Sequence, residues 1–139
     1  ALLQIKNFTL IDQLELTFNS GLNVLTGETG AGKSIILDAI DVVLGGKATS
    51  RLIRQGKHQA TIEATWRVNR SLQEWLNAQE IDPLEDGSLV ASRELTLVGN
   101  TLRSRSRING VLVNRQQLSQ LRDRLVEITA QGQTVQLMN

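Results

Sequence analysis

The sequence predicts an α/β fold in which a mixed sheet with an antiparallel strand group packs against a buried helix that follows a phosphate-binding loop. Three observations lead to this class. A glycine-rich motif at 27–34 stands between an apolar run of strand length and an apolar run of helix length. Two strand-like segments precede this motif, and several alternating segments follow its helix.

The first strands are predicted at 2–8 and 12–18. In the second, Leu14, Leu16 and Phe18 alternate with polar residues, which is the period of a half-buried strand. A turn at 19–21 leads into a third, apolar strand at 21–26. The chain therefore enters the glycine-rich motif from a strand, as a phosphate-binding loop requires.

The loop is a complete G-x-x-x-x-G-K-[ST] motif, the Walker A sequence. Its glycines let successive backbone N–H groups point at phosphate oxygens, Lys33 reaches the β and γ phosphates, and the Ser34 hydroxyl coordinates Mg²⁺. A glycine-rich turn that matches by chance is the alternative, which the flanking strand and helix disfavour. We expect a nucleoside triphosphate to bind Gly27, Glu28, Thr29, Gly30, Ala31, Gly32, Lys33 and Ser34.

The helix predicted at 34–44 places the positive end of its dipole under the phosphates. It is apolar on nearly all sides, so we expect it to be sandwiched between layers, and Gly45-Gly46 should end it. Asp38 and Asp41 lie one turn apart on this helix. A capping or bridging role is expected for both, rather than chemistry.

A second group of strands follows, at 60–68, 89–97 and 103–108. Asn109-Gly110 then precedes a short strand at 111–113, which is typical of a type I′ hairpin. A capping box at 71–74 opens a short helix between the first two of these strands. This strand order disfavours a small nucleotide kinase, in which parallel βαβ units follow the loop.

The last helix is predicted to begin at Asn114, because Gln117 three residues later completes a capping pair. Leu118, Leu121 and Leu125 share one face of this helix. The apolar run at 126–130 is predicted as a further short strand.

The composition is that of one globular domain of 139 residues. The absence of cysteine excludes disulfides, and with a single histidine a zinc site is not expected. No segment is long and apolar enough to span a bilayer, and no signal peptide is recognised. We therefore expect a cytoplasmic protein without a membrane partner.

Positive charge is concentrated in the last third, where residues 93–124 hold seven arginines against two acidic residues. Arg103, Arg105 and Arg107 alternate along one predicted strand and so share a face. Such a row can follow a phosphate backbone, and with few aromatic residues any DNA contact should be independent of sequence. An edge strand with a charged, solvated face is the equally simple alternative.

Several motifs together resemble the bacterial RecN family, SMC-like ATPases that repair DNA double-strand breaks. They are the opening LQIKNF at 3–8, GLNVLTGETGAGKS at 21–34, LGGKA at 44–48, LIRQG at 52–56, and RSR at 103–105 leading into ING at 108–110. The resemblance implies that residues 1–139 form the N-terminal lobe of a split ABC-type head that binds ATP and Mg²⁺. It also implies that ATP binding drives dimerisation with a second head, and that the protein works on nucleoid DNA during recombinational repair.

The resemblance further implies roles for residues outside the loop. Lys6, Asn7 and Arg54 are expected near the nucleotide, although a surface lysine and a solvated loop arginine are the plain alternatives. Gln131 matches the family's glutamine that contacts Mg²⁺ and the attacking water, with Gln133 as the other choice.

Two family elements have no counterpart in the sequence, namely an apolar strand ending in Asp-Glu and the ABC signature motif. In the family both lie beyond a long coiled coil, in a C-terminal lobe. The resemblance thus implies that these residues alone hydrolyse little or no ATP. A nucleotide-gated scaffold that tethers DNA without significant hydrolysis is the alternative function.

Overall fold

The computed structural model describes residues 2–17 and 30–131, and the side chains of 2–17 and 35–125. Its centre is a six-stranded sheet with the strand order β2-β1-β3-β4-β5-β6, in which every neighbouring pair is antiparallel. The strands are β1 (Leu2–Phe8), β2 (Ile11–Thr17), β3 (Gln59–Arg67), β4 (Ser88–Val98), β5 (Thr101–Ile108) and β6 (Val111–Val113). The helices are α1 (Gly30–Val43), the short 3-10 helix η2 (Ser50–Leu52), α2 (Arg70–Ala78) and α3 (Arg115–Gln131).

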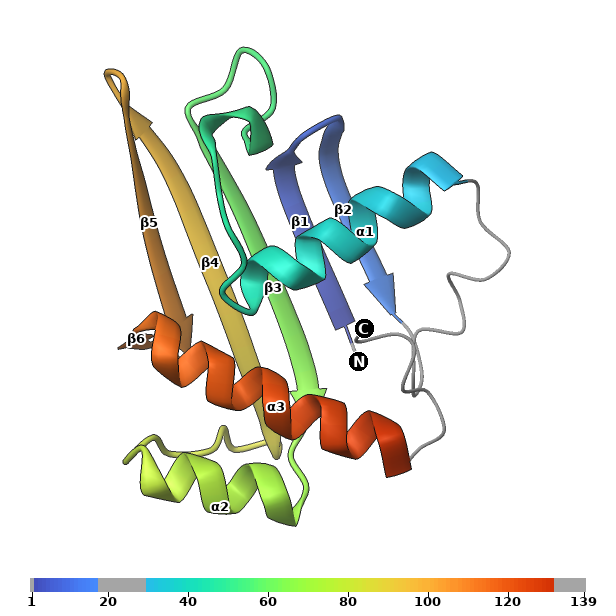
Figure 1. The fold of residues 1–139 in the computed structure, drawn as a ribbon, viewed down its shortest axis with the longest axis vertical. Helices are drawn as coiled ribbons and strands as arrows, with labels where there is room; N and C mark the ends of the chain where they lie inside the picture. Colours follow the sequence, from blue (N-terminus) through green and yellow to red (C-terminus); the bar gives the residue numbers. More distant parts are fainter. Residues whose placement is uncertain (1, 18–29, 132–139) are drawn as a thin grey trace.

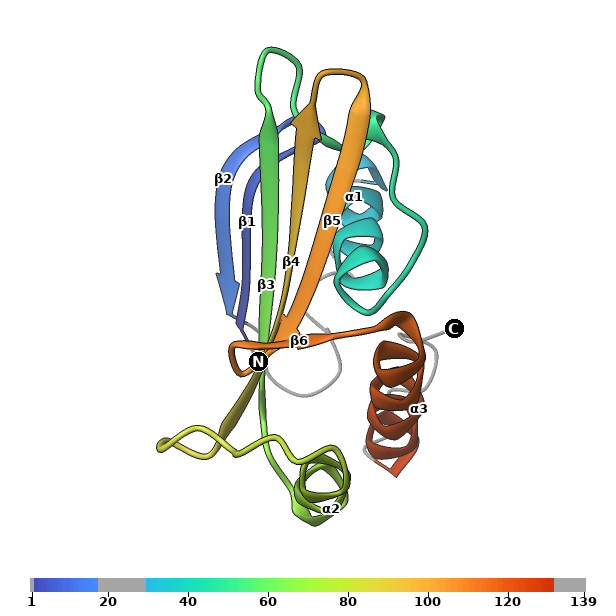
Figure 2. The same cartoon turned by 90° about the vertical axis from the view of Figure 1, so that its left-hand side faces the viewer.

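The helices cover one face of the sheet. Seen along the sheet plane, α1 and α3 lie on the same side, α2 lies at one end beside α3, and no described element lies on the opposite side (Figures 1 and 2). The side chains follow this division, because Leu3 and Ile5 of β1 are buried whereas Gln4 and Lys6 are exposed. The sheet therefore has one apolar face under the helices and one polar, uncovered face in the described part of the chain.

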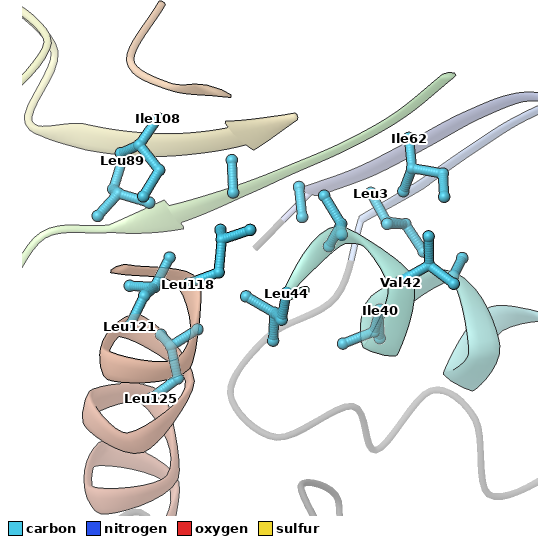
Figure 3. Close-up of a cluster of buried hydrophobic side chains, with 14 of the residues drawn as sticks. Leu3, Ile40, Val42, Leu44, Ile62, Leu89, Ile108, Leu118, Leu121 and Leu125 are labelled. Atoms are coloured by element: carbon cyan, nitrogen blue, oxygen red, sulfur yellow. The ribbon is translucent and has the colours of Figure 1, made fainter. Parts of the chain in front are cut away.

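The core lies between the sheet and the two covering helices (Figure 3). Leu118, Leu121 and Leu125 form the buried stripe of α3, as the spacing predicted. They pack with the end of α1 and with the apolar face of the sheet. The most deeply buried members of this core are Leu3, Phe8, Ala39, Val43, Ile62, Leu76, Leu89, Ala91, Ile108 and Leu121. No helix of the described residues is long and apolar enough to cross a membrane.

The predicted hairpin between β5 and β6 is confirmed. Asn109 and Gly110 both have positive φ, 52° and 86°, and Ile108 pairs with Val111 across the turn. The Asn109 side chain also fixes the turn to the rest of the sheet. Its Oδ1 accepts from the Val90 N–H at 2.9 Å, and its Nδ2 donates to the Asp82 carbonyl at 2.9 Å.

The start of α3 is confirmed and its end is different from the prediction. The Gln117 N–H donates to Asn114 Oδ1 at 2.8 Å, and the Asn114 N–H donates to Gln117 Oε1 at 2.9 Å, a reciprocal capping box. The helix then continues to Gln131, so the strand predicted at 126–130 was wrong. In a run this short, the spacing of apolar residues cannot distinguish a strand from the continuation of a helix.

Three smaller differences concern α2 and α1. The N-cap of α2 is Asn69, whose Oδ1 accepts from the Leu72 N–H at 2.9 Å, rather than the predicted Ser71. Helix α1 begins at Gly30, four residues before the predicted start. Asp38 and Asp41 are exposed, so α1 is not enclosed on all sides by the described residues as its apolar composition had predicted. Its end at Gly45, with a φ of 100°, agrees with the prediction.

Candidate functional site

The phosphate-binding motif lies partly outside the described residues. The predicted strand at 21–26 and the first loop residues, Gly27, Glu28 and Thr29, fall there. The remaining motif residues, Gly30–Ser34, form the first turn of α1. The motif therefore runs directly into a helix N-terminus, whose free N–H groups and dipole favour an anion. The contacts of Lys33 and Ser34 stay predictions, because their side chains are not described.

The end of β1 and the turn to β2 contain two residues with a strained backbone. Asn7 and Thr9 have φ values of 54° and 48°, a left-handed region that a β-branched residue such as threonine rarely adopts. Strain of this kind costs roughly 1–3 kcal/mol for each residue and is concentrated at functional sites. Within the described residues, the Asn7 Oδ1 and the Thr9 Oγ1 are buried and have no hydrogen-bond partner. Both atoms therefore have capacity for a polar ligand.

The backbone after η2 runs beside this turn. The Thr9 N–H donates to the Leu52 carbonyl at 2.8 Å, the Arg54 N–H donates to the Asn7 carbonyl at 2.8 Å, and Phe8 forms a bridge with Ile53. These contacts bring together Asn7 and Arg54, two of the residues predicted near the nucleotide. We call Asn7, Thr9 and Arg54 the turn cluster.

The Arg54 guanidinium makes one ion pair in the described part of the chain, with Asp12 Oδ1 at 3.4 Å. Both side chains are partly exposed, and an ion pair of this kind holds an arginine only weakly. Arg54 can therefore exchange this partner for a more strongly charged one.

Lys6 is not brought together with the turn cluster. Its side chain lies on the uncovered face of the sheet, opposite α1, where it lines an open groove of about 470 Å³ with Gln13, Thr61 and Glu94. Gln131 is the last residue of α3 rather than a residue near a strand end, and its side chain is not described.

The arginine row lies on the uncovered face of β5. Ser104, between Arg103 and Arg105, points the other way and accepts a hydrogen bond from Arg93 on the helix-covered side. Within the described residues, the side chains of the three arginines in the row make no ion pair or hydrogen bond, although Glu94 stands opposite Arg105 in the ladder. Strand β6 pairs only with 106–108, so the first part of β5 is an edge among the described strands, as the alternative interpretation expected.

One buried charge was missed by the sequence reasoning. Arg93 of β4 is only 9% exposed, and its Nη1 donates to the carbonyls of Val42 and Gly46 at the end of α1. Its Nε donates to Ser104 Oγ at 2.8 Å. Burial lowers the pKa of the Arg93 guanidinium below its ordinary value, the neighbouring Arg115 lowers it further, and Asp41 opposes both. The available signal was an arginine at an apolar position of an alternating strand.

The comparisons with known proteins agree with this architecture. The AAA domain family matches residues 2–137. The chain is 59% identical over 137 residues to the DNA repair protein RecN of Synechocystis sp.. The aligned region covers 99% of this chain and 24% of that protein. It is 38% identical over 138 residues to the DNA repair protein RecN of Halalkalibacterium halodurans, with coverage of 99% and 24%. The chain thus spans about a quarter of the length of these curated relatives.

A solved structure shows the same fold. A chain from a structural study of ATP-driven dimerization and DNA-stimulated activation of SMC ATPases matches with a TM-score of 0.65 and 23% sequence identity. The match covers 89% of this chain and 77% of that chain. It confirms the predicted fold class, because the two chains share one fold. With the family match over residues 2–137 and the RecN relatives, the resemblance predicted from the sequence is confirmed, and the chain belongs to the AAA domain family.

Proposed function

We propose that this chain is the ATP-binding N-terminal lobe of a split ATPase head that acts in the repair of DNA double-strand breaks. The observation that carries the proposal is the complete Walker A sequence at 27–34, which continues directly into the first turn of α1. Membership of the AAA domain family and the two RecN relatives support the same role.

In this proposal the nucleotide is held from two sides. The backbone N–H groups of the loop and of the first turn of α1 bind the phosphates, Lys33 pairs with the β and γ phosphates, and Ser34 holds Mg²⁺. The turn cluster contributes polar groups from the sheet, because Asn7 and Thr9 each have a buried oxygen without a partner in the described residues. Arg54 adds a cation beside them.

Magnesium, when bound, would neutralise part of the charge on the β and γ phosphates. We propose that Gln131, at the end of α3, orients the attacking water and contacts the metal. The Thr9 hydroxyl, unpartnered among the described residues, can donate to a nucleotide oxygen, whereas Asn7 Oδ1 is an acceptor and suits a donor group of the nucleotide, such as a ribose hydroxyl or a base amino group.

Hydrolysis needs parts that this sequence does not carry. We propose that a C-terminal lobe of the same protein supplies the acidic strand, and that a second head supplies the signature motif across an ATP-bound dimer. The relatives are about four times as long as this chain, which leaves room for such a lobe and a connecting coiled coil. The complete protein would then act on nucleoid DNA.

We propose a sequence-independent DNA contact at the arginine row. Alternate residues of a strand are about 6.6–6.8 Å apart, so Arg103, Arg105 and Arg107 present a regular line of charge. In the described residues none of the three is paired, and their face of the sheet is uncovered. Guanidinium groups in such a line can contact successive phosphates.

The nucleotide proposal is tested by calorimetric titration of ATP into the Lys33→Ala variant of the full-length protein. Loss of the loop cation should lower ATP affinity at least tenfold, by the magnitude of a charge-assisted phosphate contact of roughly 1.5–3 kcal/mol. Lys47→Ala is the control, since Lys47 is an exposed lysine just beyond the end of α1. Equal affinity in Lys33→Ala and wild type would refute the phosphate-loop assignment.

A further inference from the structure

The last turn of α1 is held by an arginine from α3. Arg122 Nη2 donates to the Asp41 carbonyl at 2.9 Å and to Asp41 Oδ1 at 2.8 Å. The same Asp41 carbonyl also accepts from the Gly46 N–H at 2.9 Å, in the turn that ends α1. A single guanidinium nitrogen therefore contacts both the backbone and the side chain of one residue at the negative end of the α1 dipole.

Other polar side chains of α3 contact α2. The Trp75 Nε1 donates to Gln120 Oε1 at 3.0 Å, and Arg124 Nη1 donates to Ser71 Oγ at 3.1 Å. Helix α3 also packs on the turn that follows α1, because the side chain of Leu118 lies close to Gly45. Helix α3 thus stands between α1 and α2, and Arg122 provides its charged contact with α1.

This inference rests on the proposed function, in which the N-terminus of α1 binds phosphate and the C-terminus of α3 carries Gln131. Helix α1 begins within the phosphate-binding motif. In its last turn the Asp41 carbonyl accepts hydrogen bonds from Arg122 of α3 and from the Gly46 N–H. Helix α3 passes this point at Arg122 and ends at Gln131. The contact between the two helices thus joins the end of α1 to the middle of α3.

We propose that Arg122 is a positioning residue that couples the phosphate-loop helix α1 to α3, so that nucleotide in the loop sets the position of Gln131. The Asp41–Arg122 pair is partly exposed, with side-chain accessibilities of 53% and 34%. Pairs this exposed add little to stability, so a loss of kcat in Arg122→Gln would not be explained by unfolding.

Arg115 is a matched control for Arg122. Both arginines belong to α3 and line the same open groove of about 530 Å³ beside Gly45 and Gly46. Within the described residues Arg115 makes no ion pair or side-chain hydrogen bond, whereas Arg122 makes two hydrogen bonds to Asp41. Replacing either arginine by glutamine removes the same charge from the same helix.

The experiment compares Arg122→Gln, Asp41→Asn, their double variant and Arg115→Gln in the full-length protein. Nucleotide affinity, kcat and thermal unfolding are measured for each. Coupling between two sites is commonly worth a factor of five or more, so kcat should fall about fivefold in Arg122→Gln and Asp41→Asn while ATP affinity changes less than about twofold. The double variant should be no slower than Arg122→Gln alone, because that substitution already removes the guanidinium that makes both hydrogen bonds to Asp41. Arg122→Lys, which can still donate to Asp41, should recover most of kcat.

Three results would overturn the coupling. They are an unchanged kcat in both single variants, an equal fall in Arg115→Gln, and a loss of kcat that follows a loss of thermal stability across the set. Lys33→Ala, measured in parallel, separates this failure from that of the proposed function. If Lys33→Ala abolishes ATP binding while Arg122→Gln turns over normally, only the coupling is refuted. If Lys33→Ala binds ATP like wild type, the nucleotide site itself is misassigned and the coupling fails with it.

Discussion

The Arg93 Nη1 on β4 donates to the carbonyl of Val42, in the last turn of α1, at 2.7 Å. Helix α1 has no basic residue in its own last turn. The positive charge that stabilises the negative, C-terminal end of its dipole comes instead from Arg93 of β4 and Arg122 of α3. Arg93 is buried where it does so. The attachment of α1 to the sheet therefore depends on a charged side chain as well as on apolar packing.

We expect Arg93→Met to destabilise the fold by about 2–4 kcal/mol, because the carbonyls of Val42 and Gly46 lose a charged donor in a buried place. Urea unfolding followed by tryptophan fluorescence measures the change, since Trp75 is buried next to α3. Arg105→Met is the control. It should change the free energy of unfolding by less than about 0.5 kcal/mol, because Arg105 is exposed on β5. Equal stability of the two variants would show that Arg93 does not secure α1.

We expect Thr9→Val to weaken ATP binding without destabilising the protein. The substitution keeps the shape and removes a hydroxyl that is buried without a partner in the described residues, which should leave stability unchanged or raise it by about 1 kcal/mol. Thermal unfolding and calorimetric ATP titration measure the two quantities. Thr61→Val, the same change on the uncovered face of β3, should alter neither. A Thr9→Val protein that binds ATP as tightly as wild type would remove the turn cluster from the nucleotide site.

The arginine row is tested by changing Arg103, Arg105 and Arg107 together to glutamine in the full-length protein. If each contacts a phosphate, DNA binding should weaken for every sequence alike, and the log–log salt slope should flatten by roughly 0.9 for each contact. Fluorescence anisotropy across a salt series gives both values.

The matched control for the row is the triple change of Lys47, Arg70 and Arg115 to glutamine. These three residues are exposed, lie outside β5 and carry the same total charge. An equal loss of binding in the two triple variants would mean that net charge, and not the strand face, attracts DNA.

Residues 1–139 alone should hydrolyse ATP at the background rate, because the sequence contains neither the acidic strand nor the signature motif that the family requires. Adding a purified C-terminal lobe should restore turnover, measured as phosphate release. Circular dichroism of residues 1–139 checks that the isolated chain is folded. The split-head proposal would be contradicted if residues 1–139 hydrolysed ATP and Lys33→Ala abolished that activity. A full-length protein that binds ATP and DNA without turnover would instead favour the alternative function, a nucleotide-gated scaffold that tethers DNA.

Local chemistry was enough to predict the elements whose signals lie within a few residues. The Asn109-Gly110 turn needs positive φ at two successive residues, and Asn114 with Gln117 completes its capping box over one helical turn. The limits of the last helix were missed, because 126–130 has no turn residue to end α3 and no alternation that is distinctive of a strand.

The site was predictable only where its residues form a continuous motif. The phosphate loop occupies eight successive positions, whereas Thr9 becomes notable through a backbone angle and an unpartnered hydroxyl that no sequence pattern encodes. Arg93 and Arg122 contact α1 from positions about 50 and 80 residues further along the chain, and only the folded sheet brings them there.

The packing around Gly46 limits which residues can occupy this position in homologous sequences. A Cβ at this position would overlap the Asp41 carboxylate, the same group that Arg122 holds. Any larger residue at 46 must therefore displace the Asp41 carboxylate, and Arg122 then loses its charged acceptor. Positions 41, 46 and 122 should consequently vary together among homologous sequences, so that a lineage that loses the glycine also changes the acid and the arginine.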